Sequence, residues 1–451
     1  MMKHTGFSIV SAGQLYVLSI VSALFMVVPH TYASPEEMTV EDAIRLGLKN
    51  NYAIQIARNT AEIAVNNKGK GLANFLPVID TNSDLRYDNT NENTGSPMSF
   101  GDSVARTSDT YLSLTWTLFD GFRMFADKKR YDELAMSGEY EARDRIEGTV
   151  INIMGSFFNL VQQEQLLDVI HDTLAVSKRR LEREEIRRDL GGASSTDLLN
   201  ARVNYNNDES TLLDQELAAT IALNELNIAL ARDPLTPVVV KKEIVIPPLA
   251  MGYEEILKMA QEENSTLLTA RFDKRVAEED VRIAKSVFWP RLSLNGNYGY
   301  ADRDLFGDDI MPGTDRNRHS IDSTVGLFLS FNVFNGNVDR INFQNARLGL
   351  LNRDLSLKNI ENEITGLVRE TYTTYQKRMA KVKLEEENTS TAQQNMELQK
   401  ELYATGASDS LDFRDAQVLY ARAQVSLIVS RFDARISLLE IQQLIGNVAI
   451  E

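Results

Sequence analysis

The chain has 451 residues, enough for two or three domains, and its 48 Lys and Arg against 64 Asp and Glu give a formal net charge of −16. This acidity argues against a nucleic-acid partner, because neutralising phosphates requires clustered basic residues. The chain has no cysteine, which excludes disulfides, thiolate catalysis and Cys-based zinc sites, and none of its four histidines is spaced to share a metal with another, so we expect no metal and no cofactor.

Residues 1–33 have the pattern of a signal peptide. A lysine precedes an apolar stretch that is densest over residues 15–28, and small residues at Thr31 and Ala33 suit cleavage before Ser34. A membrane-anchor helix is the alternative, disfavoured because a polar residue interrupts the run and no stop-transfer flank follows. After Ser34 no uninterrupted apolar run approaches the ~20 residues that a spanning helix needs, so we expect any later membrane passage to use strands.

The remaining chain contains one unit twice, because four short landmarks recur in the same order at offsets of 213 to 215 residues. The pairs are 40–51 with 253–264, Phe75-Leu76-Pro77 with Phe288-Trp289-Pro290, Leu118-Phe119-Asp120-Gly121 with Val333-Phe334-Asn335-Gly336, and Gly191, Asp197 and Ala201 with Gly406, Asp412 and Ala416. These matches predict a first repeat over 34–231, a linker over 232–250, a second repeat over 251–446 and a tail over 447–451.

Each repeat is predicted to combine helices with one strand pair. No proline occurs in 98–233 or 313–451, so very long helices are permitted there. The expected elements of the two repeats are a helix (39–74; 252–287), a β-hairpin (78–119; 291–334), a long helix (122–190; 337–404) and a returning helix (194–231; 408–446). Because the two shorter helices together match the long one in length, we expect them to stack end to end beside it.

Smaller patterns add detail to the helices and the linker. Val368, Tyr372, Tyr375, Met379 and Val382 step by four and three residues, the seam spacing of a coiled coil. Apolar residues within 238–248 predict a short strand in the linker, and the Arg179-Arg180 pair is expected on a solvated helix face.

In the hairpin segments the period changes to alternation. Over 111–119, apolar residues alternate with Ser113, Thr115 and Thr117, and 321–331 alternates similarly, as in transmembrane strands with a lipid-facing and a lumen-facing side. The residues predicted to face lipid are Leu112, Leu114, Trp116, Leu118, Leu327 and Leu329. An ordinary half-buried soluble sheet is the alternative that the pattern alone leaves open.

Four strands per chain cannot close a barrel in lipid, where unpaired edge N–H and C=O groups are costly. Barrels begin at eight strands, so several chains must share one. Two chains would give eight strands and an interior filled by side chains, whereas three would give twelve and room for a lumen.

Taken together, the doubled unit, the Phe-x-Pro and Phe-x-Gly motifs flanking the strands, and the segments 190–197 and 405–412 at the helical turns resemble the TolC-type outer-membrane channel-tunnel family, the outer membrane efflux proteins. The resemblance covers nearly all of 38–446. It implies a mainly α fold with transmembrane β: long coiled-coil-like helices forming a periplasmic tunnel, and four strands per chain contributing to a trimeric twelve-stranded barrel in outer-membrane lipid. It also implies a non-enzymatic homotrimer that docks to a periplasmic adaptor and an inner-membrane transporter.

The resemblance also suggests site residues at the helical turns. Asp412 and Asp415, one helical turn apart, match an acidic entrance constriction, and Asp197 corresponds in the first repeat. Six carboxylates from three chains would attract cations, although an Asp near a helix start is also a common capping choice. The turn glycines Gly191, Gly192 and Gly406 would face the adaptor.

A closed-state lock is the second feature that the resemblance implies. Tyr403 matches its aromatic residue, but Ser408 occupies its arginine position, so the lock's bond must be absent or replaced. The candidates to replace it are Arg187, Arg188 and Arg414.

The sequence therefore predicts an exit duct for small molecules or drugs in the outer membrane, with an extension into the periplasm of a Gram-negative envelope. The outer-membrane component of a type I protein secretion system is the alternative within the family. A periplasmic coiled-coil adaptor or scaffold is the rival from another class, and it would not need two alternating hairpins.

Overall fold

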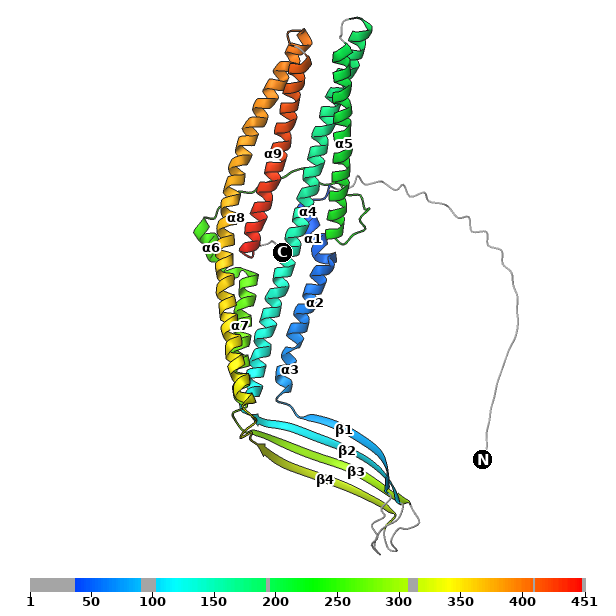
Figure 1. Ribbon diagram of the computed structural model, residues 1–451, viewed down its shortest axis with the longest axis vertical. Helices are drawn as coiled ribbons and strands as arrows, with labels where there is room; N and C mark the ends of the chain where they lie inside the picture. Colours follow the sequence, from blue (N-terminus) through cyan, green and yellow to red (C-terminus); the bar gives the residue numbers. More distant parts are fainter. Residues whose placement is uncertain (1–36, 91–102, 192–194, 307–314, 409, 448–451) are drawn as a thin grey trace, which may run out of the picture.

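The computed structural model describes residues 37–90, 103–191, 195–306, 315–408 and 410–447, so the predicted signal peptide, Gly192 and most of the predicted tail lie outside the described residues. Long helices run side by side along the molecule, and one sheet bends away at their lower end (Figure 1). The elements are α1 (Val40–Asn50), α2 (Tyr52–Asn66), α3 (Lys68–Ala73), β1 (Val78–Thr90), β2 (Ser103–Asp120), α4 (Arg123–Asp189), α5 (Ser195–Ala229), α6 (Tyr253–Glu263), α7 (Ser265–Ser286), β3 (Arg291–Phe306), β4 (Asn317–Ser330), α8 (Val338–Thr405) and α9 (Ser410–Leu444).

Two helical hairpins form the upper half of the molecule (Figure 1). The long helices α4 and α8 have 67 and 68 residues, which at ~1.5 Å per residue gives about 100 Å each. Helix α4 packs on α5 and α8 packs on α9, while contacts between α4 and α9 join the two hairpins. The predicted long and returning helices therefore agree with the structure to within a few residues.

The predicted helices 39–74 and 252–287 are wrong as continuous elements, because asparagines break them at equivalent places. Asn51 and Asn264 have extended backbones, and each side chain caps the helix that follows. The other end of each amide holds the end of a returning helix: Asn51 Nδ2 donates to the Ala229 carbonyl at 2.7 Å, and Asn264 Nδ2 donates to the Leu444 carbonyl at 3.2 Å. Each break thus lies at the end of a returning helix, α5 or α9. The helix that follows the break can therefore continue the stack, as predicted.

The hydrophobic core follows the helices as two clusters. One is built around Ile153, Phe157 and Val161 of α4 with Leu226 of α5. The second comprises α6, α8 and the end of α9, and it includes the predicted seam residues from Val368 to Met379. The coiled-coil spacing read from the sequence is therefore confirmed as a packing seam.

The linker after α5 has no regular strand, contrary to the expectation for 238–248. Among the described residues, Val240 alone forms a bridge there, parallel to Met38, with Met38 N donating to the Val239 carbonyl at 2.8 Å. In the part of the chain that the structure describes, the linker pairs with this short stretch before α1 and with no other strand, and Pro247 and Pro248 cannot donate to a ladder. Lys242 fastens the linker to α4 through Asp168, at 2.9 Å.

The four strands form one antiparallel sheet in the order β1-β2-β3-β4. Residues paired across neighbouring strands share a face, and the register joins Trp116 to Leu294 and Leu294 to Leu327. One face carries Ile79, Leu112, Leu114, Trp116, Leu292, Leu294, Tyr298, Tyr300, Ile321, Val325, Leu327 and Leu329. The other carries mainly polar residues, among them Asp80, Ser113, Thr115, Ser293, Asn295, Asn297 and Thr324.

The predicted alternation is therefore present as a sheet with one apolar and one polar face. Leu118 differs from the other predicted residues because it lies at a register shift between Thr117 and Phe119. The strand edges on β1 and β4 have no further strand beside them in the described chain.

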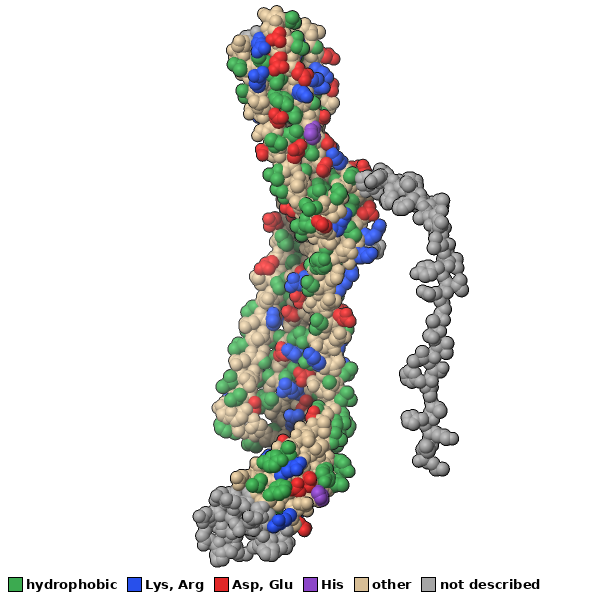
Figure 2. All heavy atoms as spheres, turned by 90° about the vertical axis from the view of Figure 1, so that its right-hand side faces the viewer, with side chains coloured by type: hydrophobic (Ala, Val, Ile, Leu, Met, Phe, Trp, Pro, Cys, Tyr) green, Lys and Arg blue, Asp and Glu red, His purple; other side chains and the backbone are tan. Residues whose placement is uncertain are grey.

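Acidic and basic side chains are interspersed along the helices on the face seen in Figure 2, with many charges at the tip. None of the described helices combines the length and apolar composition needed to cross a membrane.

Candidate entrance site at the helical turns

Both helical hairpins turn on a glycine in the left-handed region. Gly191 follows α4 with φ of 75°, and Gly406 follows α8 with φ of 78°, a conformation that side chains with a Cβ rarely adopt. After Gly406, Ala407 N donates to the Leu402 carbonyl at 2.9 Å and closes the end of α8. The two glycines thus set the sharp turns at which α5 and α9 begin, and both turns lie at the same end of the molecule (Figure 1).

The predicted acidic residues lie just after these turns. Asp197 and Asp412 are in the first turns of α5 and α9, and Asp415 is one turn further along α9; all three are exposed. Ser408 Oγ lies 3.0 Å from Gln399 Oε1 and 3.3 Å from Asp412 Oδ2, and these two acceptors share its single hydroxyl hydrogen, so Ser408 contacts both helices of the turn. An acidic group here also compensates the helix dipole. The role of these aspartates in a ring stays a prediction, because a ring needs further copies of the chain.

Tyr403 is buried between the two hairpins. Its hydroxyl donates to Glu184 Oε1 of α4 at 3.0 Å, and its ring stacks on Phe413 with 5.4 Å between centroids. The Arg183 guanidinium lies 4.1 Å from the centre of the same ring, a cation–π contact. Glu184 is fully buried and also pairs with Arg187 at 3.1 Å, so Tyr403 is bound from several sides by α4 and α9.

A second group of side chains also joins the two hairpins. Arg414 of α9 donates to both carboxylate oxygens of Asp208 on α5, at 2.8 and 2.9 Å, and to Ser177 Oγ of α4 at 3.0 Å. Ser177 also donates to Asp208, and Gln417 Nε2 donates to the Thr173 carbonyl at 3.1 Å. A two-pronged guanidinium–carboxylate pair of this kind fixes geometry as well as adding energy.

The three arginines proposed from the sequence as substitutes for the lock's arginine have different partners. Arg187 pairs with Glu184, the acceptor of the Tyr403 hydroxyl, and Arg414 pairs with Asp208. Arg188 bonds to Asp189 at 3.0 Å. Of the three, only Arg187 joins the group of side chains around Tyr403 through a shared carboxylate.

Arg180 is only 5% exposed, so its expected place on a solvated helix face is wrong, whereas Arg179 is exposed. Loss of hydration lowers the pKa of Arg180; Tyr403, Glu184 and Asp197 act in the opposite direction, and Arg414 adds to the lowering. The same interactions place Asp197 in the electrostatic surroundings of this arginine.

Glu184, Asp208, Ser177 and Arg183 were not predicted as members of the site. One signal was available, because Thr173, Ser177, Arg180 and Glu184 step by four, three and four residues along α4. This is the spacing of a coiled-coil seam, but its members are polar, and a search for apolar residues passes over them.

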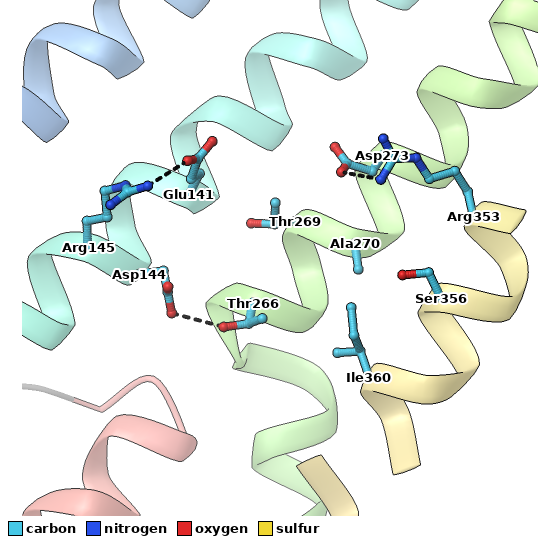
Figure 3. A pocket seen from close by; sticks show the side chains of 10 residues that line it. All are labelled: Glu141, Asp144, Arg145, Thr266, Thr269, Ala270, Asp273, Arg353, Ser356 and Ile360. Carbon is cyan, nitrogen blue, oxygen red and sulfur yellow. Dashed lines mark hydrogen bonds and ion pairs between the residues drawn. The ribbon is translucent and has the colours of Figure 1, made fainter. Parts of the chain in front are cut away.

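The described residues contain no group of three or more His, Asp or Glu side chains able to hold a metal ion. A cavity of about 350 Å³ lies between α4, α7 and α8 (Figure 3). Its carboxylates are each paired: Glu141 with Arg145 at 3.3 Å, Asp144 with the Thr266 hydroxyl at 3.0 Å, and Asp273 with Arg353 at 3.7 Å. The lining has a formal charge of −1, from three carboxylates and two arginines, and each carboxylate already has a partner.

Comparisons with known proteins give a consistent result. The family model described as "Outer membrane efflux protein" matches residues 43–232 and 256–447. The chain is 21% identical to the outer membrane protein TolC of Escherichia coli K12, over 83% of this chain and 75% of the relative, and 21% identical to TolC of Vibrio cholerae, over 67% and 68%. Its fold is similar to the crystal structure of the Campylobacter jejuni CmeC outer membrane channel, with a TM-score of 0.78 at 16% identity, covering 90% of this chain and 85% of that chain.

Proposed function

Since this chain belongs to the outer membrane efflux protein family, we propose that it forms a homotrimeric exit duct. The duct passes small molecules from an inner-membrane transporter and a periplasmic adaptor through the outer membrane to the exterior. The observation that carries this proposal is the two-faced sheet whose edge strands, β1 and β4, have no partner within the described chain.

The sheet supports the proposal through the cost of its edges in lipid. An open sheet would leave a row of N–H and C=O groups on β1 and β4 without partners, which hydrocarbon does not tolerate. Three copies joined edge to edge give twelve strands, with the apolar face toward lipid and the polar face toward a lumen. In this arrangement Leu112, Leu114, Trp116, Leu327 and Leu329 face lipid, whereas Leu118 lies at the register shift, where Phe119 pairs with Leu292 instead.

The helices supply the second part of the duct. Two hairpins per chain extend away from the sheet (Figure 1). Six hairpins from three chains would enclose a tunnel in the periplasm. The turns at Gly191, Gly192 and Gly406 then form its far end, where an adaptor would dock. The proposed domain organisation is a signal peptide over 1–33 that is cleaved on export, followed by tandem repeats over 34–231 and 251–446 that a linker joins.

The entrance is proposed to be acidic and gated. Asp412, Asp415 and Asp197 of three chains would surround the opening between the turns, attracting cations and repelling anions. Tyr403 would hold the entrance closed through Glu184, with Ser408 tying the turn to Asp412 in place of the family's arginine. Opening would then require α8 and α9 to part from α4 at this seam.

Single-channel recordings in planar bilayers test the entrance. The wild-type protein is expected to give cation-preferring channels, and Asp412→Ala with Asp415→Ala is expected to reduce the preference and widen the entrance. The control removes two exposed carboxylates far from the turns, Glu262→Ala and Glu387→Ala, and is expected to behave as wild type. Equal cation selectivity in all three proteins would contradict the proposed acidic entrance. No conductance from wild-type protein would contradict the proposed duct.

A further inference from the structure

A cavity of about 460 Å³ lies where the helices meet the sheet. Strand β2 leads into α4 and helix α7 leads into β3 at the end of the sheet next to the helices (Figure 1). The residues that line the cavity belong to these two junctions, so the cavity lies at the helix-facing ends of the two central strands, within one chain and away from the sheet edges. Phe122 and Phe125 at the start of α4 and Trp289 before β3 line it, and each is more than half exposed.

Three cations line this cavity against one carboxylate. They are Lys129 of α4 with Arg282 and Lys285 of α7, and the carboxylate is Glu279 of α7. Glu279 is 1% exposed and binds Lys129 Nζ at 3.1 Å and Arg282 Nη1 at 3.0 Å, so a buried group holds both cations at the rim. Within the described residues, the Lys285 ammonium has no hydrogen bond or ion pair.

These cations keep donors for a ligand. An ammonium has three N–H donors and a guanidinium has five, so one carboxylate cannot use them all. The lining has a formal charge of +2, from three positive groups and one negative group. An anion with several acceptor oxygens fits this arrangement, and phosphate is such an anion.

Aromatic contacts connect the cavity to the apolar face of the sheet. Trp116, which lies on that face, donates from Nε1 to the Phe75 carbonyl at 2.9 Å. The Phe75 ring packs edge-on against Phe125, with centroids 5.1 Å apart, and Phe122 in turn contacts both Phe125 and Trp289. Aromatic side chains next to cations are typical of the boundary between hydrocarbon and water in membrane proteins.

We propose that this cavity binds the phosphate of a phospholipid in the leaflet that faces the helices, with the acyl chains lying on Phe122, Phe125 and Trp289. Lys129, Arg282 and Lys285 bind the phosphate oxygens, and Glu279 positions two of these cations. The inference rests on the proposed placement of the sheet in the outer membrane. A lipid held here fixes the depth of the sheet in the bilayer at the point where the helices begin.

Fluorescence quenching tests the site, because the chain has only two tryptophans and Trp116→Phe leaves Trp289 as the sole reporter. The full-length Trp116→Phe protein, delipidated in neutral detergent, is titrated with phosphatidylglycerol brominated on its acyl chains. Saturable quenching is expected, and adding Arg282→Gln with Lys285→Gln is expected to weaken binding by about tenfold or more. The control, Lys70→Gln with Lys128→Gln, removes two cations from nearby α3 and α4 that do not line the cavity, and is expected to change binding less than twofold.

Three outcomes would overturn the inference: unchanged binding in the Arg282→Gln, Lys285→Gln protein, equal quenching by a brominated diacylglycerol without phosphate, or displacement of the lipid by inorganic phosphate at the same concentration. The last would assign the cavity to free phosphate. Assembly and conductance of wild-type protein are measured in parallel. A conducting trimer without this lipid site contradicts only the present inference, whereas a protein that neither assembles nor conducts contradicts the proposed function.

Discussion

Three glutamates, Glu147, Glu184 and Glu279, are buried among the helices, and each bonds to a residue from the other half of the chain. Glu147 accepts from the Ser265 hydroxyl at 2.9 Å, Glu184 from Tyr403, and Glu279 from Lys129. A buried carboxylate that loses a partner is strongly destabilising, because its charge stays out of water. These bonds therefore fix how the two halves pack at three separate levels.

Tyr403→Phe tests the bond at the tip. The ring can keep its stacking on Phe413, but the bond to buried Glu184 is lost, at a cost of about 1–2 kcal/mol. Amide hydrogen exchange at the ends of α4 and α8 is expected to become about 5- to 30-fold faster, measured by mass spectrometry of tip peptides. Tyr205→Phe is the control, since that exposed hydroxyl is 3.5 Å from Glu209. Equal exchange in both variants would contradict the link between Tyr403 and α4.

Asp354 gives a pH dependence with a defined sign. Hydrogen bonds from Lys274 and Lys358 lower the pKa of this carboxyl to about 2. A lowered pKa stabilises the folded state above the carboxyl's ordinary value near 3.8, and this contribution is lost as the pH falls toward 2. The difference in thermal stability between wild type and Asp354→Asn is therefore expected to be constant near neutral pH and to close between about pH 4 and 2. A difference that persists undiminished at pH 2 would contradict this.

At the scale of the elements, apolar spacing predicted the long and returning helices. Residues such as Val368 and Tyr375 recur at coiled-coil spacing, and they pack together in the core. The breaks at Asn51 and Asn264 were not predicted, because asparagine inside an apolar period does not reveal that its amide will hold another helix end. The polar seam around Arg180 and Glu184 was missed for a related reason: burial of charge depends on partners from distant elements.

Variants of Asn264 separate its two contacts. Asn264→Ala loses both the cap of α7 and the bond to the Leu444 carbonyl, and is expected to lower the free energy of unfolding by about 2 kcal/mol. Asn264→Asp keeps the capping oxygen but cannot donate, so its carboxylate faces a carbonyl oxygen and only the cap survives. Urea unfolding followed by circular dichroism measures both; an alanine variant as stable as wild type would contradict the double role.

Two glycines of α4 form a matched pair. A Cβ on Gly138 would lie 2.6 Å from the Ala64 Cβ of α2, whereas a Cβ on Gly155 meets no atom within 4 Å. Gly138→Ala is therefore expected to be destabilising by about 1–3 kcal/mol through overpacking, and Gly155→Ala to be stabilising by about 0.5–1 kcal/mol through helix propensity. Thermal unfolding of the two variants checks both signs, and the same sign for both would contradict the close approach of α2 and α4.

At the scale of the whole molecule, the resemblance read from the repeated motifs is confirmed by the family match over both halves of the chain. The mainly α fold with four strands is confirmed too, and so is the expectation that the protein is not an enzyme, because its relatives are outer-membrane channels. Strand β1 alternates poorly in sequence, yet it pairs with β2 along its whole length. Which residues of β1 lie on the apolar face follows from its register with β2, and the sequence of β1 alone does not show this register.

The sequence predicts that one chain cannot close a barrel by itself, but it does not fix the number of chains in the assembly. Two alternating hairpins predict four strands, and the structure orders them into a sheet with free edges on β1 and β4. The number of copies that close the barrel depends on the tilt of the strands and on their stagger between neighbouring chains. The sequence of one chain determines neither quantity by itself.

Disulfide trapping tests most directly whether neighbouring chains join β1 to β4. The natural chain has no cysteine, and three strand spacings of about 4.8 Å separate β1 from β4 within one sheet, too far for an internal disulfide. Asp80→Cys on β1 is combined in turn with single cysteines along β4, such as Thr324→Cys, and the oxidised protein is separated on denaturing gels. A closed trimer is expected to give bands of one, two and three chains and nothing larger. Monomer alone at every β4 position, or a ladder continuing beyond three, would contradict it.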